Sequence, residues 1–279
     1  MPIQIITDSG SDLPTDFIAA HSITIVHLPV SFQDELMPDD TDAASFYARM
    51  RACPELPRTA SPSPNTFLEA YKAVEPGRDI LVVSMSSNIS STYQSALIAK
   101  GLYEDEGLPN RIEIIDSKTF SGGLSLVVSQ AAEWAGACSS LDELKDKVSR
   151  LALETSAFFT LDSLENVIKG GRLSRLAGGV ASVLNIKLLL KINEEGVVEV
   201  EEKTRGFRKA LNSLLARLED KQHDYENGFV AIVHSNCEVL ALEFKDRVLE
   251  KHPFKKVLFS SMGPVMGTYA GEGGIGVAF

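Results

Sequence analysis

Short apolar runs alternate with amphipathic helical patterns along the whole of this 279-residue chain. Residues 3–6, 79–85 and 111–117 have the length and composition of buried strands, and residues 92–103 and 123–137 then repeat apolar positions with a helical period. Strands that alternate with helices in this way predict α/β layers around mostly parallel sheets. The polar clusters TDSGSD, SMSSNISS and DSKTFSGG follow the strands, at the sheet edge where ligands bind in open α/β folds.

The second half of the chain has a different order of elements. Residues 187–205 contain two strand-like runs around a Glu-Gly turn, which predicts a β-hairpin. Amphipathic helices at residues 207–221 and 237–251 flank an apolar strand at residues 228–235. A hairpin among parallel strands makes a mixed sheet, so this half is expected to be a second α/β unit.

The expected fold is therefore α/β with two lobes. The first, at residues 1–155, is a Rossmann-like lobe with a mostly parallel sheet, in which residues 23–32 are predicted to form one strand. The second lobe, at residues 156–279, has a mixed sheet and ends in the glycine-rich segment 262–279. Glycine-dense segments allow tight turns or close approach of the backbone to a ligand.

Charge and cysteine content narrow the possible functions. The formal charge of −11 and the sequence pI near 5.0 argue against binding to nucleic acid or to an anionic membrane over a broad surface. Cys53, Cys138 and Cys237 are far apart and form no metal-binding or disulfide pattern. Without a targeting or membrane-spanning pattern, the chain is expected to be a cytoplasmic protein that is not inserted in a membrane.

Hydroxyl groups concentrate where the strand at residues 79–85 passes into the next helix. The cluster consists of Ser84, Ser86, Ser87, Ser90, Ser91, Thr92 and Tyr93, with no Lys, Arg or His among them. A helix N-terminus presents unpaired N–H groups and a positive dipole end, so these hydroxyls suit a carboxylate better than a phosphate. The alternative is that Ser90, Ser91 and Thr92 only cap the helix.

Other polar groups have simpler interpretations. Asp8, Asp12 and Asp16 resemble a metal cluster in composition, but their spacing spans a loop and a new helix, which favours capping. His234 ends a strand and is a candidate base for a serine nucleophile, yet no GxSxG motif accompanies it. The RTASPSP segment supplies a second set of short hydroxyls, which alone indicates a capped turn. Neither a metal nor a cofactor is expected.

Seven collinear motifs resemble those of the DegV family of fatty-acid-binding proteins over essentially the whole chain. They are TDSGSDL, RTASPSP, SSNISSTYQSA, DSKTFSGG, IKGGRLSRLAGGVASVLNIK, EEKTRG and MGPVMGTYAGEGGIG. The resemblance implies a two-lobed α/β protein that buries one long-chain fatty acid. It also implies a partner in bacteria, a fatty acid kinase that phosphorylates the bound carboxylate for phospholipid synthesis.

The resemblance also assigns residues to the carboxylate site. Thr59 and Ser90 match the positions that hold the carboxylate in the family, with Ser91 and Thr92 beside them; Ser91 stands where the family usually has glycine. Tyr269 replaces the histidine of the family's closing motif, and a phenol donates a hydrogen bond without becoming cationic near neutral pH. Glu272 replaces a proline and is expected to point outward, because burying an unpaired charge is costly.

The family's two basic motifs place Arg172 in IKGGR and Arg205 in KTRG. We expect these arginines either to dock the kinase or to order the carboxylate site, although a solvated surface explains the basic residues around them equally well. The protein is expected to be a monomeric, non-catalytic lipid carrier. The alternative is an enzyme that acts on an acyl or phosphoryl group at the same hydroxyl-rich site.

Overall fold

The computed structural model describes residues 3–173, 186–219 and 223–279. Its first sheet has the strand order β2-β1-β6-β7, and all neighbouring strands are parallel. The strands are β1 (Gln4–Asp8), β2 (Thr24–Val26), β6 (Ile80–Ser84) and β7 (Ile112–Asp116). Every residue of β1 and β6 is buried, as expected for central strands that are covered on both faces. The parallel sheet predicted for the first half is confirmed.

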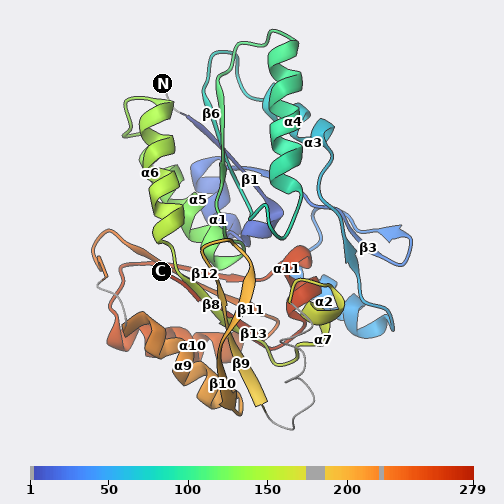
Figure 1. The fold of residues 1–279 in the computed structure, drawn as a ribbon, viewed down its shortest axis with the longest axis vertical. Coiled ribbons are helices and arrows are strands. Elements are labelled where there is room, and N and C mark those ends of the chain that lie inside the picture. The colour runs from blue at the N-terminus through green and yellow to red at the C-terminus, as the bar shows by residue number, and fades with distance from the viewer. Residues whose placement is uncertain (1–2, 174–185, 220–222) are drawn as a thin grey trace.

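Helices cover both faces of this sheet, because successive strand residues point to opposite sides. On one face, Ile80 and Val82 share a buried cluster with residues of α3 (Pro64–Lys72) and α4 (Thr92–Asp105). On the other face, Leu81 and Val83 share a cluster with residues of α5 (Gly122–Ala135) and α6 (Leu141–Glu154). In Figure 1, α4 and α6 flank the strands β1 and β6. The short helices η1 (Ser9–Ser11) and α1 (Thr15–His21) follow β1.

The second sheet has six strands in the order β10-β9-β8-β13-β11-β12. The strands are β8 (Ala157–Thr160), β9 (Ile186–Ile192), β10 (Val198–Arg205), β11 (Phe229–Ser235), β12 (Lys256–Ser261) and β13 (Gly274–Ala278). Strands β11 and β12 are parallel, and the other neighbours are antiparallel. Helices α9 (Phe207–Glu219) and α10 (Glu238–Lys251) pack against this sheet (Figure 1). The mixed sheet and the predicted hairpin β9–β10 are confirmed.

Helix α5 forms a layer between the two sheets. Every residue from Gly122 to Ala131 is buried, which is typical of a helix covered on all sides. Leu124 and Val127 pack towards the first sheet, and Leu126 joins a cluster with residues of β8 and β11 in the second sheet. Within the described part of the chain, no helix combines the length and the apolar content needed to cross a membrane. Helix α5 belongs to the interior of the fold, because buried residues of both sheets pack against it.

The prediction of one strand at residues 23–32 was wrong. Strand β2 ends at Val26, and β3 (Val30–Phe32) belongs to a separate antiparallel sheet with β4 (Glu35–Leu36) and β5 (Arg58–Thr59). Pro29 lies between the two strands, and a proline has no N–H to donate to a strand ladder. The chain therefore leaves the first sheet there. Strand β5 then places Thr59 next to Tyr269 of the second half.

The glycine-rich segment at the end of the chain is more regular than the sequence indicated. Residues Pro264–Ala270 form helix α11, with Pro264 in its first turn, and the segment then enters β13. A Cβ atom on Gly267 would lie 2.7 Å from the aromatic ring of Phe46 and from the hydroxyl of Tyr47, both on α2 (Ala43–Ala52). This glycine therefore serves close helix packing.

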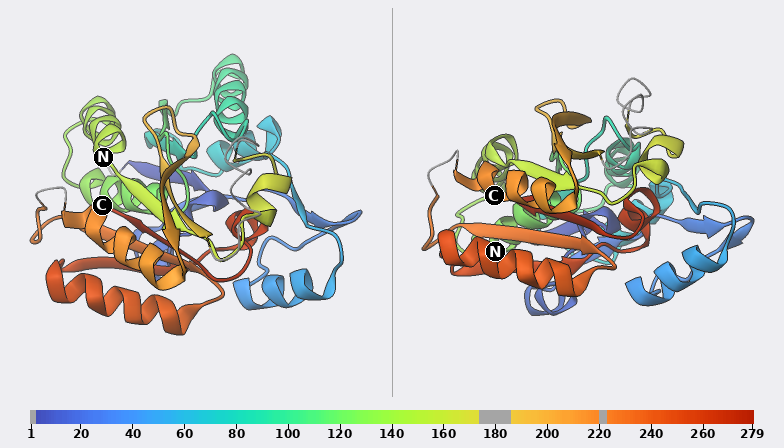
Figure 2. Two further views of the ribbon diagram at one scale, coloured as in Figure 1. Left: turned by 60° about the horizontal axis from the view of Figure 1, so that its bottom comes forward. Right: turned by 90° about the horizontal axis from the view of Figure 1, so that it is seen from below.

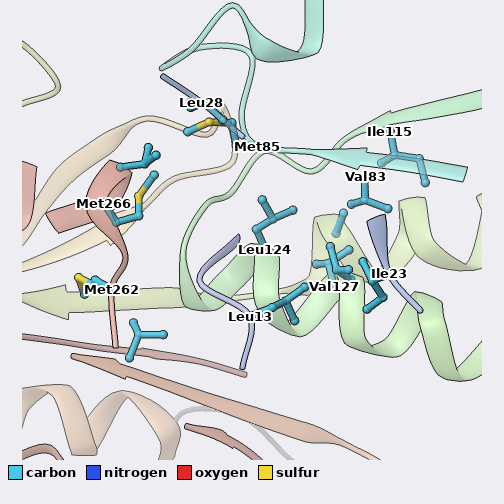
Figure 3. Packing of buried hydrophobic residues seen from close by; sticks show 14 of the residues in the cluster. Leu13, Ile23, Leu28, Val83, Met85, Ile115, Leu124, Val127, Met262 and Met266 are labelled. Carbon is cyan, nitrogen blue, oxygen red and sulfur yellow. The ribbon is translucent and has the colours of Figure 1, made fainter. Parts of the chain in front are cut away.

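The two halves of the chain share one large buried cluster. It contains Leu81 and Val83 from the first sheet together with Leu190, Met262 and Met266 from the second half. Figure 3 shows Met262 and Met266 at one end of this cluster, with Ile23 and Ile115 at the other. The hairpin β9–β10 also projects from the second sheet between α4 and α6 (Figure 2, left). The division into lobes at residue 155 stays a prediction.

The turn of this hairpin is fastened to the first half of the molecule. The side-chain amide of Asn88 donates to the carbonyl oxygen of Glu195, with a distance of 2.6 Å. Gly196 has a φ of +80°, and a Cβ atom there would lie 2.2 Å from Ser86 Oγ. Only glycine allows both this backbone conformation and this approach. The hairpin therefore closes one side of the space between the two sheets.

Candidate functional site

A cavity lies between the two sheets, at the N-terminal end of α5. Its empty volume is about 840 Å³, counting the part that is open to solvent. The walls come from both halves of the chain, including Met85 after β6, Gly122 of α5, Val233 of β11 and Met266 of α11. The site therefore exists only when the two halves are packed together.

The walls of the cavity are mostly apolar. Phe120, Phe158 and Phe159 line it together with Ile192 and Val198, which belong to the two arms of the hairpin β9–β10. The rings of Phe120 and Phe159 meet edge to face, with centroids 6.2 Å apart. Binding of a hydrocarbon ligand against such a surface is favourable, because apolar area of the ligand and of the wall is removed from water.

Methionines form another part of the wall. Met85, Met262 and Met266 all line the cavity, and Figure 3 shows them with Leu28 at the end of the buried cluster nearest α11. A methionine side chain is unbranched and flexible, so it adapts to the shape of a neighbour. This part of the wall suits an aliphatic chain better than a rigid polar ligand.

Two hydroxyl groups meet at the polar end of the cavity. Thr59 Oγ1, on β5, and the hydroxyl of Tyr269, on α11, share a hydrogen bond of 2.6 Å. These residues are 210 positions apart in the chain and both line the cavity. Two of the residues that the sequence motifs assign to the carboxylate site are thus neighbours in the fold, while their role in binding a carboxylate stays a prediction.

A second group of hydroxyls surrounds Ser90. Ser90 Oγ bonds to Ser61 Oγ at 3.0 Å and to Thr92 Oγ1 at 2.7 Å, and Ser91 donates to Ser61 at 2.8 Å. Ser90 lines the cavity, whereas Ser61 is not among the lining residues and contacts Ser90 from the loop after β5. The RTASPSP segment therefore contributes more than a capped turn, and Ser61 was missed as a neighbour of the site.

Helix capping explains only part of this cluster. Ser91 occupies the N-cap position of α4 but makes no capping hydrogen bond with its side chain. Ser90 Oγ accepts a hydrogen bond from the N–H of Thr92 at 3.3 Å, which is a local bond of the capping kind. The bonds of Ser90 and Ser91 to Ser61 join the segment just before α4 to the loop at residue 61. The cluster is therefore a network between two loops.

The ring of Tyr269 is held by the turn that follows α7 (Glu165–Lys169). A Cβ atom on Gly170 would lie 2.6 Å from two carbons of this ring, so only glycine fits at this contact. The guanidinium of Arg172 lies over the same ring, 4.9 Å from its centroid, and donates to the carbonyl oxygen of Gly170 at 2.6 Å. The double glycine before Arg172 was the signal for this contact in the sequence.

The two predicted arginines occupy different places. Arg172 lines the cavity and touches Tyr269, so it belongs to the polar end of the site although its side chain is exposed. Arg205 lies at the exposed end of β10 and is not among the residues that line the cavity. Arg175, in the same basic segment as Arg172, lies outside the described residues. The structure thus separates two residues that the sequence motifs had suggested for one role.

Glu272 points away from the cavity, as expected. Its carboxylate forms an ion pair with Arg51 and accepts a hydrogen bond of 2.5 Å from the side-chain amide of Asn236. Its side chain is 36% exposed. The negative charge is therefore satisfied at the surface and does not oppose an anion at Tyr269.

Asp8 is a fully buried carboxylate at the end of β1. It accepts hydrogen bonds from the N–H groups of Gly10 and Met85 and from Ser84 Oγ, at 2.8–3.0 Å. The bond to Gly10 caps η1, which confirms the capping interpretation for this residue. Burial raises the pKa of Asp8 to about 6, although the three hydrogen bonds act in the opposite direction.

Asp12 joins elements from both halves beside the cavity. It accepts from Ser121 Oγ at 2.6 Å and from the N–H of Gly263, just before α11, at 2.8 Å. Burial, with a smaller contribution from the charge of Asp8, raises its pKa to about 7. The sequence suggested only a cap, because these partners are far away in the chain. Asp12 instead fixes two segments whose residues line the cavity.

The described residues hold no group of three or more His, Cys, Asp or Glu side chains that could bind a metal ion. Asp16 lies exposed on α1 and accepts a hydrogen bond from its neighbour Phe17. His234 packs against the ring of Phe259, and its Nδ1 accepts from the N–H of Cys237 at 3.4 Å. These contacts give His234 a packing role at the end of β11.

Comparison with known proteins assigns this chain to a protein family. Residues 2–279 match the sequence profile of a family described as uncharacterised proteins of the DegV family. The chain belongs to the DegV family. It is 31% identical over 280 residues to a DegV domain-containing protein of Caldanaerobacter subterraneus subsp. tengcongensis, covering 99% of this chain and 98% of the relative.

Solved DegV structures share the whole fold. A DegV protein of Ruminococcus gnavus, refined with vaccenic acid, superimposes with a TM-score of 0.91 at 26% identity, covering all of both chains. The fatty acid kinase B3 protein of Streptococcus pneumoniae, loaded with linoleic acid, has a TM-score of 0.86 at 27% identity and covers 100% of this chain and 99% of its own. Both of these DegV proteins hold a fatty acid as ligand.

Proposed function

We propose that this protein binds one long-chain fatty acid, with its carboxylate at Thr59, Ser90 and Tyr269 and its acyl chain in the apolar cavity. The observation that carries the proposal is the form of the cavity, which has apolar walls of phenylalanine and aliphatic side chains and a pair of bonded hydroxyls at its polar end. The fatty acids bound to the Ruminococcus and pneumococcal DegV proteins support it.

The acyl chain supplies most of the affinity in this proposal. A sixteen-carbon chain buries about fourteen CH₂ groups at roughly 0.8 kcal/mol each, or on the order of 11 kcal/mol before ordering costs. One neutral hydrogen bond contributes about 1 kcal/mol net. The hydroxyls at Thr59, Ser90 and Tyr269 therefore fix the position of the head group more than they set the binding strength.

We further propose that the protein presents the bound carboxylate to a fatty acid kinase and is not itself the catalyst. Support comes from the exposed Arg172 beside the polar end of the cavity and from the pneumococcal relative, which is named for a fatty acid kinase. Arg205, also exposed, is proposed to extend the docking surface. We also propose that the protein is a monomer and is located in the cytoplasm, and that its two lobes are residues 1–155 and 156–279.

The binding proposal is tested by extracting the purified protein with organic solvent and analysing the extract by mass spectrometry. A co-purified long-chain fatty acid in near-stoichiometric amount is the expected result. An empty extract, together with no uptake of added fatty acid, would refute the proposal.

The docking proposal is tested with Arg172→Glu and Arg205→Glu at limiting carrier concentration and a cognate kinase. Reversed charge at a docking surface lowers partner affinity and association rate, so acyl-phosphate formation should fall more than lipid binding. Arg150→Glu, an exposed position on α6, serves as the charge-matched control. Equal turnover for all four proteins would remove the docking role.

A further inference from the structure

The polar end of the cavity is built from groups that both donate and accept hydrogen bonds. Thr59 and Tyr269 share one bond, and Ser90 bonds to Ser61 and Thr92. Each of these hydroxyls carries one donor and has lone pairs left to accept. Such a network can rotate its protons to suit either an acceptor or a donor on a ligand.

The cavity has few charged side chains in its wall. Among the described residues that line the cavity, Arg172 is the one charged side chain. Its guanidinium is stacked on the ring of Tyr269 and bonded to the carbonyl oxygen of Gly170, and its side chain is exposed. An exposed charge is screened by water and salt, so it discriminates weakly between ligands.

We infer that this cavity also takes long-chain lipids whose head group is neutral and hydrogen-bonding, with the primary fatty amide as the type. The inference rests on the proposed function, because it uses the same acyl cavity. An amide has the size and planarity of a carboxylate. Its oxygen accepts from Ser90 or Tyr269, and its NH₂ group donates to lone pairs that a carboxylate leaves unused.

The test compares hexadecanamide with hexadecanoate as competitors for a bound fluorescent fatty acid at pH 7.5. The two affinities are expected to agree within about tenfold, because the chain is the same and the head groups differ by few hydrogen bonds. An amide bound more than about 100-fold more weakly than the acid would overturn the inference while leaving the proposed function intact. Binding of neither lipid would overturn both.

Tyr269→Phe links this binding to the hydroxyl network. It removes the bond to Thr59 and one partner of the ligand, so the amide should bind about fivefold more weakly. Tyr225→Phe, which removes a hydroxyl that bonds to His252 and lies outside the residues that line the cavity, is the matched control and should leave amide binding unchanged. Equal amide affinities for the two variants would place the amide elsewhere and overturn the inference.

Discussion

Replacing Asp12 by asparagine should change how the stability of this protein depends on pH. Asp12 is only 8% exposed, and it accepts from Ser121 Oγ at 2.6 Å and from the N–H of Gly263 at 2.8 Å. An asparagine can accept from Gly263 through its carbonyl and donate to Ser121 through its amide. The substitution therefore removes the charge while it keeps both contacts between the halves.

The magnitude follows from the pKa. Burial raises the pKa of Asp12 from 3.8 to about 7, so the folded protein keeps a proton that the unfolded chain has lost between these two pH values. Because the folded state then binds more protons, the free energy of unfolding falls as pH rises, by about 1.4 kcal/mol per unit. Between pH 5 and pH 7 the loss attributable to Asp12 is roughly 2 kcal/mol, because the slope decreases as the pH approaches the pKa, and the loss levels off above about pH 7.

The assay is urea unfolding followed by circular dichroism at half-unit intervals from pH 5 to pH 8. The unfolding free energy of Asp12→Asn minus that of the wild type should increase by about 2–3 kcal/mol across this range. Asp8 titrates in both proteins, so its contribution largely cancels in the difference. Gly101→Ala, an exposed position on α4 where the substitution changes no ionisable group, is the control and should give a flat difference. Parallel curves for Asp12→Asn and wild type would refute the reasoning.

Three predictions concern the polar end of the cavity. Thr59→Val combined with Ser90→Val should weaken binding of a fluorescent fatty acid by about tenfold, because two hydrogen-bonding side chains are lost; an unchanged affinity and ligand pose in a crystal structure would contradict the head-group assignment. Tyr269→His should make binding stronger at pH 5.5 than at pH 8 relative to the wild type, since an imidazole titrates near about pH 6.5 and its cation attracts a carboxylate. Superimposable profiles would mean that position 269 lies too far from the carboxylate. Gly170→Ala should displace the ring of Tyr269, whose carbons would lie 2.6 Å from the new Cβ atom, and weaken binding severalfold in the same assay. Gly101→Ala, where a Cβ atom meets nothing within 4 Å, should have no effect, and equal losses in the two variants would point to a general effect on the fold.

The sequence by itself determined the layers of the fold. Apolar runs at residues 79–85 and 111–117 became β6 and β7, and the alternation of strands with helices predicted the parallel sheet. These patterns are readable because burial of a strand or helix imposes a period on neighbouring residues. The sequence motifs also singled out Thr59, Ser90 and Tyr269, which all line the cavity.

Only the tertiary structure decided which distant residues meet. Asp12 bonds to residues 109 and 251 positions away, and Gly170 approaches Tyr269 across nearly 100 positions, as the residue numbers show. Arg172 and Arg205 come from equally suggestive motifs, yet only Arg172 lines the cavity. A local sequence pattern indicates the face of a helix or strand on which a side chain lies. Which distant residue that side chain contacts depends on how whole helices and strands pack together. Contacts between the two halves are therefore set by the packing of the sheets around α5, which no single stretch of sequence encodes.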